Sequence, residues 1–276
     1  MTLVGAYVGN DVEAARRFER VVGRLDFISL FVGEASADDF IGSVSWIADL
    51  FAGFAKPAVW SVPLIWAGAT LADAAGGQCD SRWRAAARIL SRHRPDQAIV
   101  YVRTGWEQNG TWMKWAARNH ERQFNDAFRR FVAVFRSVSI RFRFIWCPNI
   151  DQQDPSPTFP GVDFVDLIGL DFYHFPKWDP IEPLASWTHM VTRPYGLQWH
   201  LDFARRQKKP VVYPEWGVCS DNFGAYIDLM AEWCRSSDIF FHSYWDSNAA
   251  YPGQLTSGQY AATAVAFRSA FGLHSR

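Results

Sequence analysis

The chain has few residues of the kind that build metal centres, and its charges balance. Four cysteines occur among 276 residues, with no CxxC pair and no histidine-rich spacing. We therefore expect no metal and no cofactor, although a disulfide stays open. The 28 basic and 28 acidic residues cancel, so no charge pattern suggests nucleic acid or a membrane surface as a partner.

Long apolar runs are also missing. No stretch of 18 apolar residues occurs, which argues against a membrane-spanning helix. Met1 leads almost directly into the strand-like run Leu3–Val8, without the pattern of a signal peptide. The default expectation is a cytoplasmic protein, and a secreted or periplasmic mature form stays open. The oligomeric state is not indicated.

Aromatic residues are abundant instead. The chain has 14 Trp, 22 Phe and 9 Tyr, together 16% of the residues. Many are expected in the core. Because Trp at strand ends and in loops also stacks on sugar rings, this composition mildly favours a carbohydrate ligand.

Eight apolar, β-branched runs alternate with helical patterns along the chain. The runs are Val4–Val8, Phe27–Val32, Ala58–Ile65, Ala98–Arg103, Phe142–Cys147, Val165–Leu170, Pro210–Pro214 and Ile239–Trp245. This alternation, without a linker or repeat, predicts the α/β class and a single (β/α)8 TIM barrel over residues 1–276. A doubly wound open sheet is the rival, but it would normally carry a Gly-rich turn after the first strand, and Gly5 and Gly9 do not form one.

Amphipathic periodicity predicts helices between these strands. They cover residues 12–22, 40–51, 124–135, 223–234 and 259–271, with Ser36 and Asp39 as a candidate capping box. Two Pro-rich segments, 149–163 and 174–194, are predicted as long loops after strands five and six. Loops at the carboxyl ends of barrel strands usually carry function.

Two glutamates stand beside tryptophans where strands give way to loops. Glu107 follows Trp106 after the fourth strand, and Glu215 precedes Trp216 after the seventh. A single such Glu is usually a salt-bridged loop residue. Two carboxylates facing each other across an aromatic cleft, however, hydrolyse glycosides, and they lie about 5–5.5 Å apart in retaining and about 6.5–9.5 Å apart in inverting enzymes. Sequence does not fix this distance.

The neighbours of the glutamates suggest different roles for the two. Arg103 and Tyr173 are expected to keep a nucleophile ionised through charge and hydrogen bonding. Trp106 and Trp112 are expected to desolvate an acid.

Five further residues are candidates for substrate binding, each with a structural alternative. Trp112 is a sugar platform or a helix-packing residue, and Asn149 binds a sugar hydroxyl or caps a turn. His174 lies at the barrel mouth as a subsite residue or as a solvated loop residue. Trp178, in a polar loop, is an outer-subsite candidate. Asp246 contacts sugar hydroxyls or caps a loop.

Several motifs resemble those of one family. Residues 106–115, WEQNGTWMKW, resemble the segment around the acid/base of glycoside hydrolase family 26, the β-mannanase-like enzymes of clan GH-A. Trp146-Cys147-Pro148-Asn149 and the segment 159–173 resemble two further stretches of that family. Lys209-Pro210 leading to Glu215-Trp216-Gly217 is similar to its nucleophile strand. The likeness covers about residues 98–250.

The resemblance implies a retaining mechanism with Glu107 as acid/base and Glu215 as nucleophile. It implies that Tyr173 hydrogen-bonds the nucleophile and that Trp245 is a platform under the bound sugar. The matching motif residues are then predicted to line the substrate site. These are Arg103, Trp106, Asn109, Trp146, Asn149 and Trp216.

One residue departs from the family pattern. The family usually has His before the acid/base, where this chain has Trp106. That His helps to bind the sugar next to the cleavage point, so the preferred glycan is open. The predicted function is endo-acting cleavage of a β-linked polysaccharide or oligosaccharide, such as a bacterial exopolysaccharide or a mannan-like glycan. A transglycosylase and a carbohydrate-binding pseudo-enzyme on the same scaffold are the alternatives.

Overall fold

The computed structural model describes residues 1–151 and 153–272 of the chain. Its parallel strands pair in sequence order and close into a barrel, which confirms the predicted (β/α)8 class. The strands are β1 (Leu3–Tyr7), β2 (Phe27–Phe31), β3 (Ala58–Ser61), β4 (Val100–Arg103), β5 (Phe142–Trp146), β6 (Leu167–His174), β7 (Val211–Val218) and β8 (Phe241–Trp245).

Contacts divide the chain into two compact units. Unit 1 contains Met1–Ser29 and the described part of Leu170–Arg276, and unit 2 contains Leu30–Gly169. Within the described residues, no helix has the length and apolarity needed to cross a membrane.

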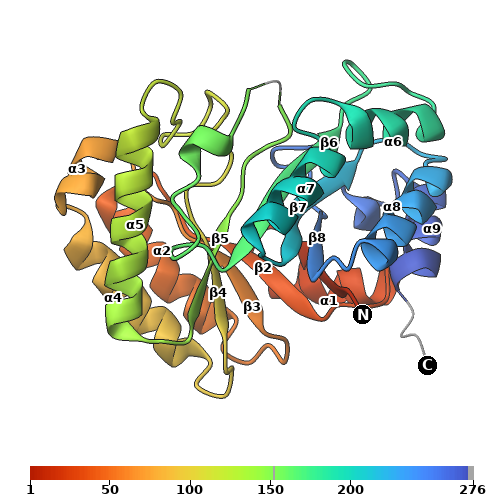
Figure 1. Cartoon of the computed structure of the whole chain (residues 1–276). Helices are drawn as coiled ribbons and strands as arrows, with labels where there is room; N and C mark the ends of the chain where they lie inside the picture. Colours follow the sequence, from red (N-terminus) through yellow and green to blue (C-terminus); the bar gives the residue numbers. More distant parts are fainter. Residues whose placement is uncertain (152, 273–276) are drawn as a thin grey trace. The chain divides into compact units, whose positions relative to one another are not determined.

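Unit 2 packs its helices around strands β3 to β5. The helices are α2 (Ala37–Leu50), α3 (Leu71–Gly76), α4 (Asp80–His93) and α5 (Glu121–Val138), with the short 3-10 helix η1 (Ser156–Thr158). Helices α4 and α5 lie side by side (Figure 1). The predicted aromatic stripe of α5 is buried, with Phe131 stacked on Phe135 at 4.2 Å and Phe135 packed against Phe142 of β5 at 5.1 Å. This aromatic layer fixes β5 beneath α5.

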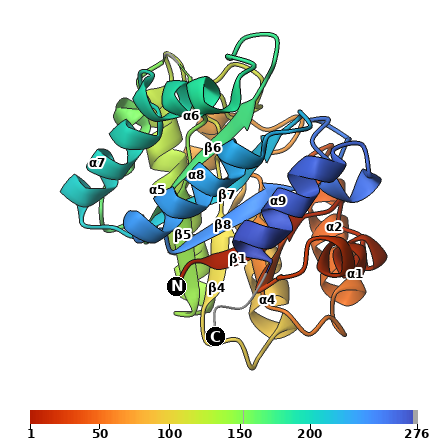
Figure 2. The ribbon, with the colours of Figure 1, turned by 90° about the vertical axis from the view of Figure 1, so that its right-hand side faces the viewer.

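Unit 1 surrounds strands β7, β8 and β1. Its helices are α1 (Val12–Val21), α6 (Pro183–Thr192), α7 (Leu197–Gln207), α8 (Gly224–Ser236) and α9 (Ala261–Phe271), with the 3-10 helix η2 (Leu255–Ser257). Figure 2 shows α8 and α9 side by side in front of β7 and β8. The Phe27 ring of β2 lies against Gly5 of β1, where a Cβ would come within 2.2 Å of the ring.

The structure changes several details of the predicted elements. Strand β3 ends at Ser61 rather than at Ile65, and helices α3, α4 and α7 are additions to the predicted set. Strands β6 and β7 are longer than expected, so Tyr173 and Glu215 lie within strands rather than after them. The predicted loop 174–194 contains helix α6, which the Glu182 carboxylate caps by accepting hydrogen bonds from the backbone N–H groups of Leu184 and Ala185. The other predicted loop contains η1, and its residue Gln152 lies outside the described residues.

The predicted start of α2 is partly confirmed. The Ser36 hydroxyl accepts a hydrogen bond from the Asp39 N–H at 3.0 Å, as an N-cap does. The Asp39 carboxylate, however, accepts from Ala35 N–H and not from Ser36, so the reciprocal half of the capping box is absent.

Candidate active site

Glu107 lies in a tight turn beyond the end of β4. Gly105 and Glu107 both have left-handed backbones, with φ of +57° and +53°. The turn is held by a hydrogen bond from Glu107 N–H to Cys147 O at 2.8 Å and one from Gly110 N–H to Glu107 O at 3.0 Å. A non-glycine residue in this conformation is uncommon and often occurs where a side chain must be aimed for function.

Both carboxylate oxygens of Glu107 accept a hydrogen bond. Asn149 Nδ2 donates to Oε1 at 2.6 Å, and Trp112 Nε1 donates to Oε2 at 2.6 Å. Asn149 is itself fixed by Asn109, whose side chain donates to Asn149 O and accepts from Asn149 N–H. The two Asn residues therefore position Glu107. The sequence suggested a sugar contact or a turn cap for Asn149, and this positioning role is neither of them.

Replacing Asn149 with alanine is expected to reduce kcat/KM on a glycoside substrate. A hydrogen bond to a charged group is worth about 1.5–3 kcal/mol, which corresponds to a loss of roughly 10- to 150-fold. Steady-state kinetics of Asn149→Ala test this. The control is Asn125→Ala, which removes an exposed hydrogen bond to Pro157 O and should leave kcat/KM unchanged. Equal activity of the two variants would contradict the positioning role.

Trp106, the residue that departs from the family pattern, lies in an aromatic box. Its ring is 5.7 Å from Phe31 and 4.5 Å from Trp115, and the Arg103 guanidinium lies 5.0 Å from its ring centroid. Arg103 also donates from Nε to Ser61 Oγ at 3.1 Å. Both residues are buried. We therefore assign Trp106 to packing beneath the Glu107 turn, where the fully buried Trp115 donates from Nε1 to Trp106 O at 2.6 Å.

Glu215 lies in β7 within an aromatic group of unit 1. Its side chain is 6% exposed overall, and the Tyr173 hydroxyl donates to Oε2 at 2.5 Å. The tyrosine contact that the resemblance implies is thus present. The Trp245 ring lies 6.2 Å from Tyr173 and 4.3 Å from Tyr7. Glu215 is held by a phenol in surroundings that exclude most water.

Tyr7 is a member of this group that sequence reasoning missed. Burial, and then the charge of Glu215, raise the pKa of its hydroxyl above the ordinary value. Its position as the last residue of β1 was the available signal, because barrel sites form at the carboxyl ends of strands.

Two of the tryptophans predicted to bind substrate are fully buried. Trp146 donates from Nε1 to Thr158 O at 3.0 Å and packs against Phe159. Trp216 donates from Nε1 to His242 Nδ1 at 3.0 Å and stacks on Phe267 of α9. Neither offers a surface to a sugar, so we correct both assignments to core packing.

His174 and Asp246 are also buried and hold loops. His174 Nε2 lies 3.1 Å from Pro180 O, and burial lowers the pKa of this ring. Asp246 accepts hydrogen bonds from the N–H and Oγ1 of Thr256, at 3.0 and 2.6 Å, and burial raises its pKa. Asp246 was expected either to contact sugar hydroxyls or to cap a loop, and its contacts with Thr256 are those of a loop cap. His174 is neither solvated nor open to a ligand.

Two predicted platform residues are exposed. Trp112 is 56% exposed and Trp178 is 69% exposed. Trp112 lies against Gly110, where a Cβ would come within 2.4 Å of the indole. Trp178 packs against Phe175 at 5.2 Å and receives Lys177 Nζ at 5.2 Å from its centroid. Both keep surface that a sugar ring can cover.

The burial of His242 makes the fold sensitive to acid. Burial, and then the nearby Arg24 charge, lower the pKa of His242 to about 3, against about 6.5 in an unfolded chain. Between these values the unfolded state binds a proton that the folded state excludes. Stability therefore falls as pH drops from about 6.5 toward 3, by up to about 1.4 kcal/mol per pH unit.

His242→Asn is expected to flatten this dependence, because the amide oxygen can still accept from Trp216 and the side chain does not titrate. Urea unfolding between pH 7 and 4.5 measures the slope. His120→Asn changes an exposed histidine and should keep the slope of the parent protein. An unchanged slope in His242→Asn would rule out His242 as the acid-sensitive group.

Across residues 1–151 and 153–272, no three His, Cys, Asp or Glu side chains gather as a metal site.

Comparison with known proteins finds a likeness to one family over part of the chain. Residues 78–194 match the model of glycosyl hydrolase family 26. A mannan endo-1,4-beta-mannosidase of Bifidobacterium adolescentis is 26% identical over 145 residues, which cover 49% of this chain and 14% of that protein. A mannan endo-1,4-beta-mannosidase A and B of Caldalkalibacillus mannanilyticus is 23% identical over 136 residues, 46% of this chain and 23% of that protein. The matched region thus spans less than a quarter of either relative.

Solved structures share the fold along nearly the whole chain. The catalytic domain of a Bacillus sp. family 26 endo-beta-1,4-mannanase superposes with a TM-score of 0.69 at 16% identity, covering 98% of this chain and 85% of that one. The fold shared with this structure is the (β/α)8 barrel. Over residues 78–194 the chain is similar to glycosyl hydrolase family 26, and the sequence relatives named above are mannan endo-1,4-beta-mannosidases.

Proposed function

We propose that the chain is a retaining, endo-acting glycoside hydrolase of a β-linked polysaccharide, with Glu215 as nucleophile and Glu107 as acid/base. The observation that carries the proposal is how differently the two carboxylates are held. Glu215 receives the Tyr173 hydroxyl inside an aromatic group. Glu107 receives one donor from the fixed Asn149 and one from the exposed Trp112.

The first step is a displacement at the anomeric carbon. A carboxylate oxygen of Glu215 forms a bond to that carbon while Glu107 donates its proton to the departing glycosidic oxygen. In the second step Glu107 takes a proton from water, the water oxygen attacks the same carbon, and Glu215 leaves. Two inversions return the original configuration.

The hydrogen bonds of Glu107 indicate which of its two donors is displaced when substrate binds. An acid needs a proton on the oxygen that faces the leaving group, and that oxygen cannot then accept an N–H in the same direction. Asn149 is fixed by Asn109, whereas Trp112 is largely exposed. We expect the bound sugar to displace the Trp112 indole from Oε2 and to stack against its ring.

The proposed substrate class is a β-1,4-linked mannan or a related β-linked glycan. The relatives matched by sequence are named mannan endo-1,4-beta-mannosidases. The buried Trp106 cannot supply the polar ring contact expected of the family His. We therefore expect weaker selection of the sugar beside the cleavage point than a family member with His would show.

A panel of soluble galactomannan, xylan and mixed-linkage β-glucan tests this proposal. We expect new reducing ends from at least one of them, and proton NMR of the first product should show the β-anomer. An α-anomer would refute retention. Transfer to an added acceptor in place of water would indicate a transglycosylase, and binding without any cleavage would indicate a pseudo-enzyme.

A further inference from the structure

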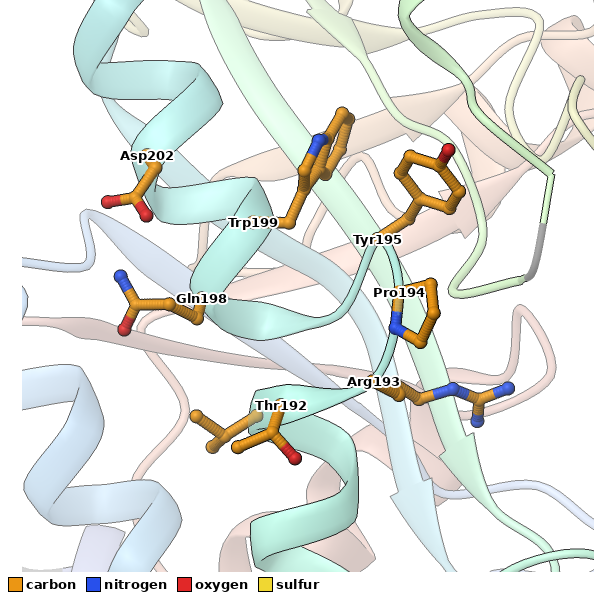
Figure 3. Close-up of a pocket in the computed structure, with 8 residues that line it drawn as sticks. Thr192, Arg193, Pro194, Tyr195, Gln198, Trp199 and Asp202 are labelled. Atoms are coloured by element: carbon orange, nitrogen blue, oxygen red, sulfur yellow. The ribbon is translucent and has the colours of Figure 1, made fainter.

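A depression lies on unit 1 where α6 ends and α7 begins, and neither glutamate is among its lining residues. Figure 3 shows its lining residues, with the rings of Tyr195 and Trp199 next to each other. The cavity has a volume of about 640 Å³, in the range of small-ligand sites. The lining residues are Val191, Thr192, Arg193, Pro194, Tyr195, Gln198, Trp199 and Asp202.

The backbone at Tyr195 is strained. Its φ is +55°, a left-handed conformation that bulky residues seldom adopt. The next residue must be glycine, because a Cβ on Gly196 would lie 2.5 Å from Met190 O. The turn is closed by Gly196 N–H donating to Arg193 O at 3.0 Å. Strain of this kind persists where a side chain is held in place for a purpose.

The strained turn brings two aromatic rings together. The Tyr195 and Trp199 centroids are 5.3 Å apart at an interplanar angle of 84°, and Trp199 stacks on Phe203 at 5.1 Å and 20°. Phe203 is buried, whereas Tyr195 and Trp199 are partly exposed. The pair is therefore backed by the core of α7 and presents ring surface to solvent.

The charges around the depression are compensated. Arg193 pairs with Asp179 at 3.5 Å, and Asp202 pairs with Arg205 at 3.6 Å. The other polar groups of the lining are neutral: the side chains of Thr192 and Gln198, the Tyr195 hydroxyl and the Trp199 indole N–H. Aromatic rings beside neutral hydrogen-bonding groups suit a ligand with an apolar face and many hydroxyls, and they do not select an anion or a cation.

The topology of unit 1 relates this depression to the strand that carries Glu215. Helix α7 leads through Lys208, Lys209 and Pro210 directly into β7. In a (β/α)8 barrel a helix runs antiparallel to the strand that follows it, so the start of α7 lies toward the carboxyl end of β7. That is the end where barrel enzymes bind substrate.

We propose that the Tyr195–Trp199 depression is an accessory binding site for sugar units of the same β-linked polysaccharide. This rests on the proposed function, because the substrate of an endo-acting hydrolase is a chain long enough to reach beyond the cleavage site. The site raises the affinity for long chains and takes no part in bond cleavage.

Tyr195→Gly tests the site with little risk to the fold, since glycine relieves the left-handed strain while the ring is removed. The probes are soluble galactomannan, xylan and mixed-linkage β-glucan in native affinity gels. The polysaccharide that slows migration of the protein in these gels is then added, and hydrogen–deuterium exchange of residues 191–203 is measured with and without it. We expect binding to slow exchange in this segment of the parent protein. Tyr195→Gly should weaken binding by about 3- to 10-fold, with Tm unchanged or raised.

Two further variants make the readout specific. Gln198→Ala removes an exposed polar group and should weaken binding by about 2- to 5-fold. Trp46→Ala, which removes an exposed tryptophan on α2, should behave like the parent protein. Turnover of a short aryl glycoside should be unchanged in all three, because the proposed mechanism uses none of these side chains.

The outcomes separate this inference from the proposed function. Cleavage of a polysaccharide without slowed exchange in residues 191–203 overturns the accessory site and leaves the hydrolase intact. Slowed exchange without cleavage supports the site and rejects the hydrolase. Absence of both across the panel rejects both, and equal affinity of Tyr195→Gly and Trp46→Ala also overturns the site.

Discussion

Glu215→Ala is expected to lower kcat by at least about 10⁴-fold, because the covalent intermediate can no longer form. The loss should be similar for polysaccharide and for activated aryl glycosides, since both need the nucleophile. Tyr173 would lose its hydrogen-bond acceptor, and the space vacated by the carboxylate can admit a small anion. Added azide should therefore restore part of the activity and yield the α-glycosyl azide, formed by a single inversion.

The control for this variant is Glu232→Gln. Glu232 is an exposed residue of α8 that pairs with Arg235 at 3.0 Å, and its neutralisation should leave kcat within about 2-fold, as expected of a surface ion pair. A Glu215→Ala protein with the same activity as Glu232→Gln would eliminate Glu215 as nucleophile.

Glu107→Ala is expected to affect substrates unequally. General acid catalysis contributes about 10²- to 10⁴-fold, and a polysaccharide, whose leaving group needs a proton, should lose that amount in kcat/KM. A dinitrophenyl glycoside leaves without a proton, so its kcat/KM should change little, although breakdown of the intermediate slows. The basic limb of the pH–rate profile should disappear.

Azide also distinguishes the two glutamates. In Glu107→Ala it attacks the intermediate from the side that water normally uses, so the expected product is the β-glycosyl azide. The opposite anomer from each variant would show that the assigned roles are exchanged. Equal losses for polysaccharide and dinitrophenyl glycoside would show that Glu107 is not the acid.

The barrel could be predicted because its signal is local. Eight apolar runs and the 3.6-residue periodicity of segments such as Phe124–Phe135 define strands and helices from neighbours in the chain. Helix α6 was missed because it lies in a Pro-rich segment with little apolar periodicity. Pro183 occupies its first turn, a position where proline suits a helix, so a helix start was the better interpretation of that proline.

The predicted sugar contact was wrong for Trp216, which stands beside Glu215, and the reason is the alternation of side chains along a strand. Glu215 and Trp216 are adjacent in β7, so they point to opposite faces of the sheet. Trp216 faces α9 and packs on Phe267. In a parallel strand both faces are apolar, and the sequence alone does not show which face is the site.

The contacts that position Glu107 were inaccessible to sequence reasoning for a different reason. Asn149 lies 42 residues from Glu107 and binds it only because Asn109 fixes the loop after β5. No periodicity or local motif links residues so far apart. Tyr173 and Glu215 are also 42 residues apart, and their contact could be predicted only from the resemblance to a family.

Trapping the covalent intermediate tests the central claim most directly. An activated 2-deoxy-2-fluoro-β-glycoside slows both steps, and its good leaving group lets the first step proceed, so the glycosyl-enzyme accumulates. Mass spectrometry of the proteolytic peptides should find one fluoroglycosyl group, on Glu215. A label on any other residue, or time-dependent turnover with no label, would contradict the assignment of Glu215 as the nucleophile of a retaining hydrolase.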